Sequence, residues 1–499
     1  MRKKNFIFLI LGIMLVSTGI KEARAEITLT DCLSVTGYFR YELAVHTGEK
    51  NPNNFLQTHK NDFNFSRTYF LTEWNYKPSD QFKLVAKIRV MGDQTQDMDS
   101  ALGDYKAFPV DVPKYDWTML RMGGKSDEFR AEANELYADL SFGDLWVRMG
   151  KQQIVWGEMI ATRIMDVINP LDMSRNLRFE PEEFDNIRIP EWSIRGRYQF
   201  GNVGPLSEFM LEGFVNPGDV QPTQYADFGS PFYAGNGIES FPSFFRITDK
   251  DRRGKTEYGF RTGGMIKSFY FTLNYLSLYN DEMLLKATGI MPDPIHGIPI
   301  FAPADWTLYS LLFDKKYPST NIFGLTCNYF IAPLNTVATF ETTWVPDQPY
   351  GDARVYAAGG AGIRDQGTWS YAIRFDRPTF VFPRPISAMT IQLQYSQTVR
   401  EGNPDMILGP ANSKLDQTDN FITLQLSQYF LHNNLSVNLL FVQDLRDATL
   451  FKPLVTYRRG NHWIFDLYTV YTAGAVKRPT RFGNSDWVNQ TVGRITYQF

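Results

Sequence analysis

The stretch Phe82–Val90, FKLVAKIRV, places an apolar side chain at every second position and mostly basic side chains between them. Successive side chains of a β-strand point to opposite faces, so this pattern predicts a strand with one apolar and one polar face. The same alternation recurs in Trp192–Phe200, Trp369–Phe375, Leu435–Phe441 and Trp463–Leu467. The sequence therefore predicts an all-β protein.

The composition excludes several other classes of protein. The chain has 499 residues, of which 43% are hydrophobic and 15% aromatic, and its formal net charge is −3. So many aromatic side chains exclude a disordered chain. No apolar run of about 18 residues occurs that could form a transmembrane helix. A mildly acidic chain without a basic patch also argues against a nucleic-acid partner.

Residues 1–25 have the features of a secretory signal peptide. Three basic residues, Arg2 to Lys4, precede the apolar run Phe6–Val16, and Ala23–Ala25 forms an A-x-A cleavage site. The apolar run is too short to span about 30 Å of hydrocarbon. We therefore expect an exported protein whose residues 26–499 form a single domain.

The length and spacing of the strands favour a transmembrane antiparallel β-barrel over a soluble sandwich. The strands are long, many begin or end in an aromatic residue, and short connections alternate with long ones. Outer-membrane barrels combine these features, with short periplasmic turns and long extracellular loops. Eighteen strands are predicted, with 16 as the alternative, at 32–46, 64–78, 81–92, 132–142, 145–157, 190–201, 206–216, 256–267, 269–280, 321–332, 335–346, 365–378, 386–400, 419–431, 434–447, 449–459, 462–473 and 487–499.

The last residues of the chain indicate the bacterial outer membrane. Ile495, Tyr497 and the terminal Phe499 alternate with polar residues, and this ending resembles the signal that the barrel assembly machinery recognises. The expected partners are therefore that machinery and outer-membrane lipid. Cys32 and Cys327 fall on the first and tenth predicted strands, on opposite walls, so no disulfide is expected.

The polar faces of the predicted strands supply candidates for the lumen. The basic ones among them are Lys83, Lys87, Arg89, Arg148, Arg195 and Arg197. One interpretation is a transverse electric field that orients a polar solute inside a channel. The other, which we favour, is a set of cross-strand ion pairs with inward acids such as Glu135 and Asp139 that stabilise a wet lumen.

The segment from Arg148 to Trp192 carries a specific family resemblance. It contains GKQQIVWGE at 150–158 and VINPLD at 167–172. These motifs resemble an uncharacterised family of Gram-negative outer-membrane proteins, domain of unknown function 1302. The resemblance implies a porin-like or transporter barrel, and some members resemble partners of systems that export lipids or hydrophobic compounds. The matching residues are Gly150, Lys151, Gln152, Trp156, Gly157, Glu158, Asn169, Pro170 and Asp172.

Residues 158–189 of this segment have two possible roles. The segment could fold into the lumen as a constriction lined by Trp156, Glu158, Arg163 and Asp172, or it could brace the barrel wall. Asn169 and Pro170 favour a turn in either case. Both interpretations remain open from the sequence.

The sequence favours a passive, selective channel for small or for amphipathic and hydrophobic solutes. The predicted loops 217–255 and 281–320 are rich in apolar residues, which suggests either an entry site for a hydrophobic molecule or loops that cap the barrel. The alternative is a closed component of a lipid or hydrophobic-compound export system, with a periplasmic or inner-membrane transport partner. An enzyme, here a barrel-embedded hydrolase, is the remote alternative, because neither H-E-x-x-H nor G-x-S-x-G occurs. No catalytic, cofactor or metal site is predicted.

Overall fold

The protein is described by a computed structural model. It describes residues 26–48, 63–94, 115–116, 120–122, 129–175, 184–225, 245–248, 255–282, 284–292, 309–352, 362–383, 387–408, 415–446, 448–474 and 486–499. The predicted signal peptide lies outside these residues. So do residues 226–244 of the predicted loop 217–255 and residues 293–308 of the predicted loop 281–320, which contain many of their aromatic and apolar side chains.

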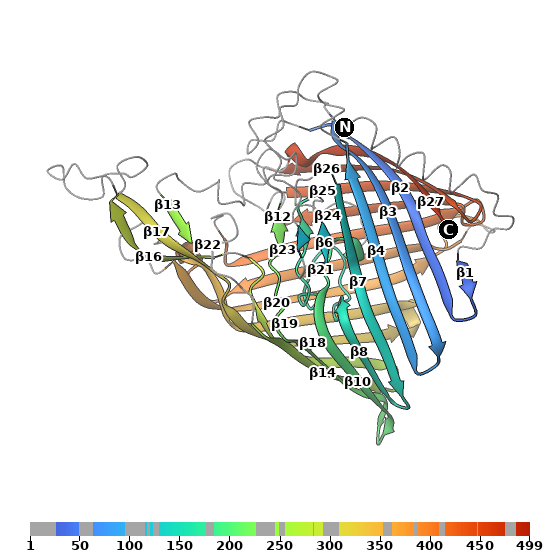
Figure 1. Ribbon diagram of the computed structural model, residues 1–499, viewed down its shortest axis with the longest axis horizontal. Helices are drawn as coiled ribbons and strands as arrows, with labels where there is room; N and C mark the ends of the chain where they lie inside the picture. Colours follow the sequence, from blue (N-terminus) through green and yellow to red (C-terminus); the bar gives the residue numbers. More distant parts are fainter. Residues whose placement is uncertain are drawn as a thin grey trace.

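The described residues form a closed antiparallel barrel of 18 strands, which confirms the predicted fold and strand number (Figure 1). Each strand of the wall pairs with its neighbours along the chain. The first wall strand, β2 (Leu33–His46), pairs with the last, β27 (Gln490–Gln498), from Tyr38 opposite Gln498 to His46 opposite Gln490. This pairing leaves the wall without a free edge, as a sheet in hydrocarbon requires.

The wall strands between these two agree with the predicted ranges to within a few residues at most ends. They are β3 (Phe63–Ser79), β4 (Phe82–Asp93), β7 (Phe129–Phe142), β8 (Leu145–Gln152), β10 (Glu191–Val203), β11 (Leu206–Asn216), β14 (Glu257–Ile266), β15 (Phe269–Tyr279), β18 (Ser319–Ile331), β19 (Thr336–Asp352), β20 (Ile363–Thr379), β21 (Met389–Arg400), β23 (Thr418–Phe430), β24 (Leu435–Asp444), β25 (Ala448–Arg459) and β26 (Trp463–Gly474).

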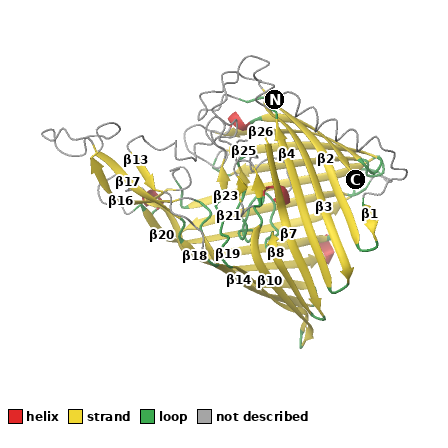
Figure 2. Cartoon of the chain, in the orientation of Figure 1, coloured by secondary structure: helices red, strands yellow, loops and turns green. Residues whose placement is uncertain are grey.

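Short elements complete the chain (Figure 2). Outside the wall strands are β1 (Ile27–Thr30), β5 (Tyr115–Asp116), β6 (Arg121–Met122), β9 (Asp172–Met173), β12 (Gln224–Tyr225), β13 (Phe245–Thr248), β16 (Leu284–Pro292), β17 (Tyr309–Lys316), β22 (Ile407–Leu408), the helix α3 (Phe184–Ile187) and the 3-10 turns Ala332–Leu334, Pro404–Met406 and Asp486–Val488. Strands β13, β16 and β17 form a separate sheet that projects from one end of the barrel (Figure 1). None of the described helices is long and apolar enough to cross a membrane.

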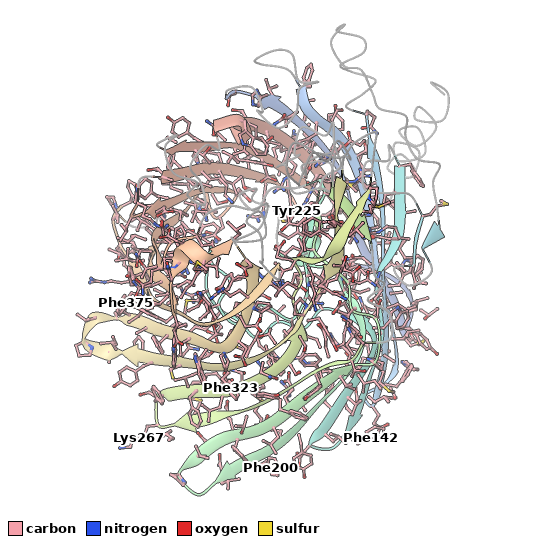
Figure 3. All side chains as sticks on the ribbon, turned by 90° about the vertical axis from the view of Figure 1, so that its left-hand side faces the viewer. Phe142, Phe200, Tyr225, Lys267, Phe323 and Phe375 are labelled. Carbon is pink, nitrogen blue, oxygen red and sulfur yellow. The ribbon has the colours of Figure 1, made fainter. Side chains whose placement is uncertain are left out.

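The outer face of the wall is apolar and exposed. Phe142, Phe200 and Phe375 lie on the outer side, whereas Tyr225 lies inside (Figure 3). Phe142 is 60% exposed. Exposed apolar surface of this extent requires a lipid environment rather than water. The alternation seen in the sequence therefore separates a lipid-facing surface from a lumenal one.

Aromatic side chains on the outer face form a row across neighbouring strands. The ring centroids of Tyr275 and Phe323 lie 5.3 Å apart, those of Phe323 and Trp344 5.7 Å, and those of Trp344 and Trp369 5.6 Å. The row crosses β15, β18, β19 and β20 at one height. Rows of this kind mark the membrane–water interface of outer-membrane barrels.

Two sequence predictions need correction. The strand predicted at 145–157 ends at Gln152, because the following residues leave the wall and enter the barrel. Cys32 lies in the turn before β2 rather than on the first wall strand. Both Cys32 and Cys327 are free thiols in the described part of the chain.

A charge on the lipid-facing side of the wall tests the membrane assignment. Leu467 on β26 faces outward and is 59% exposed. We expect Leu467→Arg to lower the free energy of unfolding from phospholipid vesicles by about 2–4 kcal/mol, because the guanidinium would enter hydrocarbon. Asn461→Arg in the neighbouring turn is the control and should cost about 0–1 kcal/mol. Equal costs in urea titrations would contradict a lipid-facing position for Leu467.

Candidate functional site

The barrel contains a segment of its own chain. After β8, residues 153–175 and 184–190, here called the inner segment, run inside the wall until β10 begins. Gly150, two residues before β8 ends, has a φ of +133°, and its Cα approaches the neighbouring strand β7 closely. A Cβ there would lie 2.2 Å from the carbonyl oxygen of Leu136. Only glycine combines this backbone angle with this approach, which explains the glycine of the GKQ motif.

Two side chains of the opposite wall hold the backbone of the inner segment. The Glu341 carboxylate on β19 accepts hydrogen bonds from the amides of Glu158, at 2.9 Å, and Met165, at 3.1 Å. On β21, the Gln394 side chain accepts from the Ile160 amide at 3.0 Å and donates to its carbonyl at 2.8 Å. Glu341 and Gln394 are both 0% exposed. They act as partners for backbone groups that have left the sheet.

The Glu158 residue is held from two further strands. Asn328 on β18 donates to both carboxylate oxygens of Glu158, at 3.1 and 2.9 Å. Arg374 on β20 donates to the Glu158 carbonyl. Arg374 also pairs with Asp376 at 3.0 Å. Glu158 is therefore the point at which the inner segment meets the inner faces of β18, β19 and β20, and its side chain stays exposed to the lumen.

Apolar side chains of the inner segment pack against the same wall. A buried cluster joins Ile154, Trp156, Met165 and Ile168 of the inner segment with Phe214, Leu276, Leu278, Ile322 and Val345 of the wall. Gly324 on β18 leaves the space that Met165 fills, since a Cβ at residue 324 would lie 2.1 Å from the Met165 sulfur. Burial of each large side chain in such a cluster contributes about 1.5–3 kcal/mol.

Internal hydrogen bonds brace the segment around the VINPLD motif. The Asn169 side chain accepts from the Ile154 amide at 2.7 Å and donates to the Ile189 carbonyl at 2.9 Å. Arg163 donates to the Asn169 carbonyl at 2.7 Å. Arg188 pairs with Asp166 at 2.7 Å. Asn169 thus joins the beginning and the end of the inner segment.

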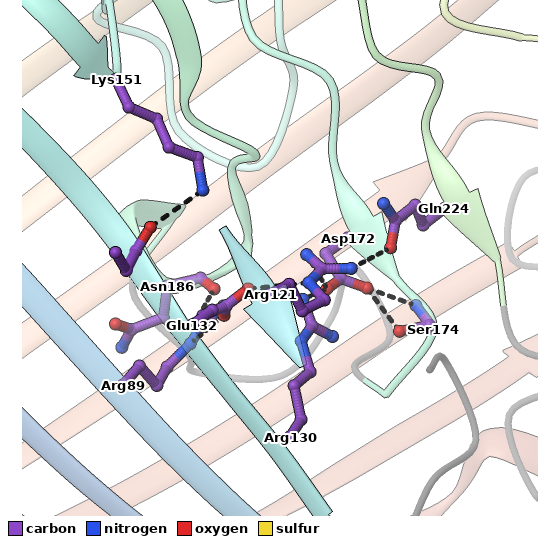
Figure 4. A network of polar contacts seen from close by, with 10 residues as sticks. Arg89, Arg121, Arg130, Glu132, Lys151, Asp172, Ser174, Asn186 and Gln224 are labelled. Atoms are coloured by element: carbon purple, nitrogen blue, oxygen red, sulfur yellow. Dashed lines mark hydrogen bonds and ion pairs between the residues drawn. The ribbon is translucent and has the colours of Figure 1, made fainter. Parts of the chain in front are cut away.

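A buried ionic network attaches the other flank of the segment (Figure 4). Asp172 accepts from Arg130 at 2.5 Å, and Glu132 accepts from Arg121 at 2.9 Å and from Arg89. Arg89 also donates to the backbone of the inner segment, at the Asn186 carbonyl, at 2.7 Å. All five charged side chains are less than 10% exposed. Breaking one member of such a network leaves a buried charge unpaired, which is costly.

Asp172 is the carboxylate of this network that the inner segment supplies. Burial alone would raise the pKa of its carboxyl, but Arg130 and Arg121 together with the Ser174 hydroxyl hold that pKa well below its usual range. The carboxylate therefore remains charged at any physiological pH. Its ionic attachment is a constant feature of the barrel rather than one that titrates.

The inner face of β7, β8 and β10 carries a second group of charges. Arg148 pairs with Asp139 at 2.7 Å. Arg195 pairs with Glu212 on β11 at 2.8 Å. These two pairs agree with the interpretation that cross-strand ion pairs stabilise the lumen. Glu212 also accepts from the Trp156 indole at 2.8 Å, so this group contacts the inner segment.

Three of the predicted inward bases do not follow that interpretation. Lys83 stands opposite Asp139 in the register, and Lys87 stands opposite Glu135. Within the described part of the chain, neither lysine forms an ion pair within 4 Å, nor does Arg197. The lumen therefore carries both paired and unpaired bases on these strands.

The structure assigns different positions to the predicted constriction residues. Trp156, Asn169 and Asp172 are buried, 7% exposed or less, so they anchor the segment instead of lining an opening. Gln152 is also buried and donates to the Ser193 carbonyl at 3.0 Å. Glu158 is exposed, and Arg163 is partly buried.

Several attachment residues were not recognised as such from the sequence. They are Glu341, Gln394, Asn328 and Arg374. Single polar residues on strands carry no motif that reveals their partner. Glu132 was missed because a register shift between Ala133 and Glu135 changes which residues of β7 face inward. Among the described residues, no group of three or more possible metal ligands occurs.

Comparisons with known proteins agree with the barrel. A family model described as "Protein of unknown function (DUF1302)" matches residues 36–403. No curated protein matches the chain. Among solved structures, OccAB3 of Acinetobacter baumannii has a TM-score of 0.50 at 10% identity, covering 94% of this chain and 99% of that one. OccK8 (OprE) of Pseudomonas aeruginosa has a TM-score of 0.47 at 10% identity, covering 94% and 97%. These likenesses concern the fold.

Removal of the Glu341 carboxylate tests the attachment of the inner segment. We expect Glu341→Ala to lower the hydrogen-exchange protection of the Glu158 and Met165 amides at least roughly tenfold, because two buried donors lose their acceptor. Thr343→Ala is the matched control: Thr343 is a buried, inward residue of the same strand. Unchanged protection in Glu341→Ala would show that the carboxylate does not hold the segment.

The depressed pKa of Asp172 gives a pH prediction. A carboxyl whose pKa is lower in the folded state contributes stability above its unfolded value, about 3.9, and loses it as the pH falls below that value. We expect the difference in urea midpoint between wild type and Asp172→Asn to stay constant from pH 7 to pH 5 and to shrink below about pH 4. A difference that already declines between pH 7 and pH 5 would contradict the ionic network.

Proposed function

The chain belongs to the family of proteins of unknown function DUF1302, and for it we propose an outer-membrane channel. It would pass small polar or amphipathic solutes passively, down their concentration gradient. The inner segment would be its constriction, and the wall left uncovered by that segment would select the solute. The barrel assembly machinery and outer-membrane lipid are the partners that this location implies, with Ile495, Tyr497 and Phe499 in the last strand as the assembly signal.

The observation that carries this proposal is the attachment of the inner segment to both flanks of the lumen. One flank consists of Glu341 and Gln394 with their neighbours on β18–β21. On the other flank, Arg130 on β7 donates a hydrogen bond to Asp172, and Arg89 on β4 donates one to the Asn186 carbonyl. A segment held on opposite sides by buried bonds narrows the lumen to a fixed size. A fixed narrowing is what distinguishes a selective channel from a wide pore.

The remaining wall combines a buried apolar cluster with charged side chains. Inward residues of β26, β27, β2 and β3 form the apolar cluster of Phe65, Ala44, Tyr468, Val470 and Val492. Inward charges of the same region pair with each other, as Arg494 does with Asp466 at 2.8 Å. Strands β4 and β10 present Lys83, Lys87 and Arg197 instead, which form no ion pair with the described residues. The apolar cluster is 3% exposed or less, so a solute in the lumen would contact the bases rather than this cluster.

A closed barrel is the second candidate function. The observation that favours it is the burial of inward apolar residues on β23–β25, where Phe421, Val442 and Leu450 are all 5% exposed or less. Such a barrel would serve an export system for lipids or hydrophobic compounds and would need a periplasmic or inner-membrane partner. Conduction distinguishes the two candidates.

Single-channel conductance in planar bilayers tests the channel. We expect the refolded protein to give small, steady steps and a variant lacking residues 158–189 to give larger ones, because the deletion removes the constriction. The double variant Glu341→Ala/Gln394→Ala keeps the chain length and should give noisy steps of intermediate size. Thr343→Ala should match the wild type.

Two results would contradict the proposal. Equal conductance of the wild type and the deletion variant would show that the segment does not limit passage. Silence of both, in protein whose barrel is intact by circular dichroism, would favour the closed barrel. Silence of the wild type alone would make the segment a plug that must move.

A further inference from the structure

We propose that the lumenal face of β8 and β10 holds a binding site for small organic anions, built from Trp146 and the guanidinium of Arg197. The site lies between the inner segment and the short-turn end of the barrel. It deepens the proposed channel, on which it rests, by naming the class of solute. Its evidence is a group of three arginines around one indole ring.

Three guanidinium groups surround the Trp146 ring. The Cζ atoms of Arg148, Arg195 and Arg197 lie 5.2, 5.3 and 5.6 Å from its centroid. The register of β8 and β10 explains why the three guanidinium groups lie together. Arg195 is opposite Arg148, and Arg197 is opposite Trp146. Like charges this close repel unless anions compensate them.

Protein carboxylates compensate only two of the three arginines. Asp139 accepts two hydrogen bonds from Arg148, at 2.7 and 2.9 Å. Glu212 accepts from Arg195 at 2.8 Å but is shared with Arg261, at 3.0 Å. Arg197 forms no ion pair with the described residues and is exposed to the lumen. The cluster therefore has an excess of positive charge at Arg197.

Neighbouring bases extend this excess along the wall. The inward bases Lys83, Lys87, Arg148, Arg195 and Arg197 lie on this side of the inner segment, among the inward acids Glu73, Glu135, Asp139 and Glu212. Glu212 stands opposite Arg197 in the register, but its carboxylate bonds Arg195 and Arg261. A lumen with low-dielectric walls concentrates the field of such a patch. Anions entering from the short-turn end would meet it before the constriction.

The combination of groups favours an organic acid over an inorganic anion. A guanidinium presents a planar fork that matches a carboxylate in a bidentate contact. The half-buried Trp146 ring offers apolar surface beside that fork. An aromatic or aliphatic acid uses both features, whereas phosphate uses only the charge.

Calorimetric titration of the refolded full chain in detergent micelles tests the site without requiring conduction. The probes are benzoate, the neutral isostere benzamide and inorganic phosphate. We expect benzoate to bind at least roughly tenfold more tightly than benzamide. Arg197→Gln should lower the affinity for benzoate roughly tenfold, because a charged hydrogen bond is lost. Arg197→Lys keeps the charge but not the planar guanidinium, and should lower the affinity for benzoate less than Arg197→Gln does.

Arg458→Gln is the matched control, because Arg458 on β25 is an exposed base near the short-turn end of another wall strand. Its benzoate affinity should stay within about twofold of the wild type. Equal binding of benzoate and benzamide, or unchanged benzoate binding in both Arg197 variants, would overturn the site. Phosphate that displaces benzoate at equal concentration would overturn the organic-acid class.

The channel and the anion site can therefore be rejected independently of each other. Benzoate that binds to a barrel silent in planar bilayers would retain the site and reject the channel. A conducting barrel without benzoate binding would retain the channel and reject the site. In a conducting barrel, benzoate should also reduce the current of the wild type and of Arg458→Gln more than that of Arg197→Gln.

Discussion

Backbone groups inside a membrane must find partners within the protein, and this constraint determines both the wall and its contents. In the wall, the pairing of β2 with β27 removes the last free edge. The inner segment leaves the sheet after Gln152, so its amides and carbonyls have no neighbouring strand to pair with. Its backbone then depends on side chains, chiefly Glu341, Gln394 and Asn169, which supply the missing acceptors and donors.

Apolar packing and hydrogen bonds contribute differently to the position and stability of the inner segment. Burial of Trp156, Met165 and their neighbours supplies most of the stabilisation, at about 1.5–3 kcal/mol for each large side chain. A single hydrogen bond adds only about 0.5–1.5 kcal/mol, but its loss leaves a buried group unpaired. The polar bonds therefore determine where the segment lies, and the apolar cluster determines how firmly it stays there. This division favours a fixed constriction over a freely moving lid.

Alternation in the sequence was sufficient to predict the barrel, because the period of two records which face of each strand meets lipid. The chain position of the inner segment was also predictable, from the motifs between Gly150 and Asp172. The sequence left open whether this segment enters the lumen or braces the wall, since Gln394 and Asn328 are ordinary polar residues until the fold brings the segment to them. Glu132 shows a second limit: the register shift in β7 brings it inward together with Glu135, and strict alternation cannot place both on one face.

The same reasoning separates the two groups of lumenal arginines. Arg89, Arg121 and Arg130 are buried and share Glu132 and Asp172, so their charge is used to hold the inner segment. The arginines around Trp146 are more exposed, and their two carboxylates, Asp139 and Glu212, leave Arg197 uncompensated. Arg197 gains a cation–π contact with Trp146, but no carboxylate of the described residues lies within 4 Å to offset the repulsion from the two neighbouring guanidinium groups. The Arg197 guanidinium, which pairs with no carboxylate of the described residues, is therefore the charge available to a solute.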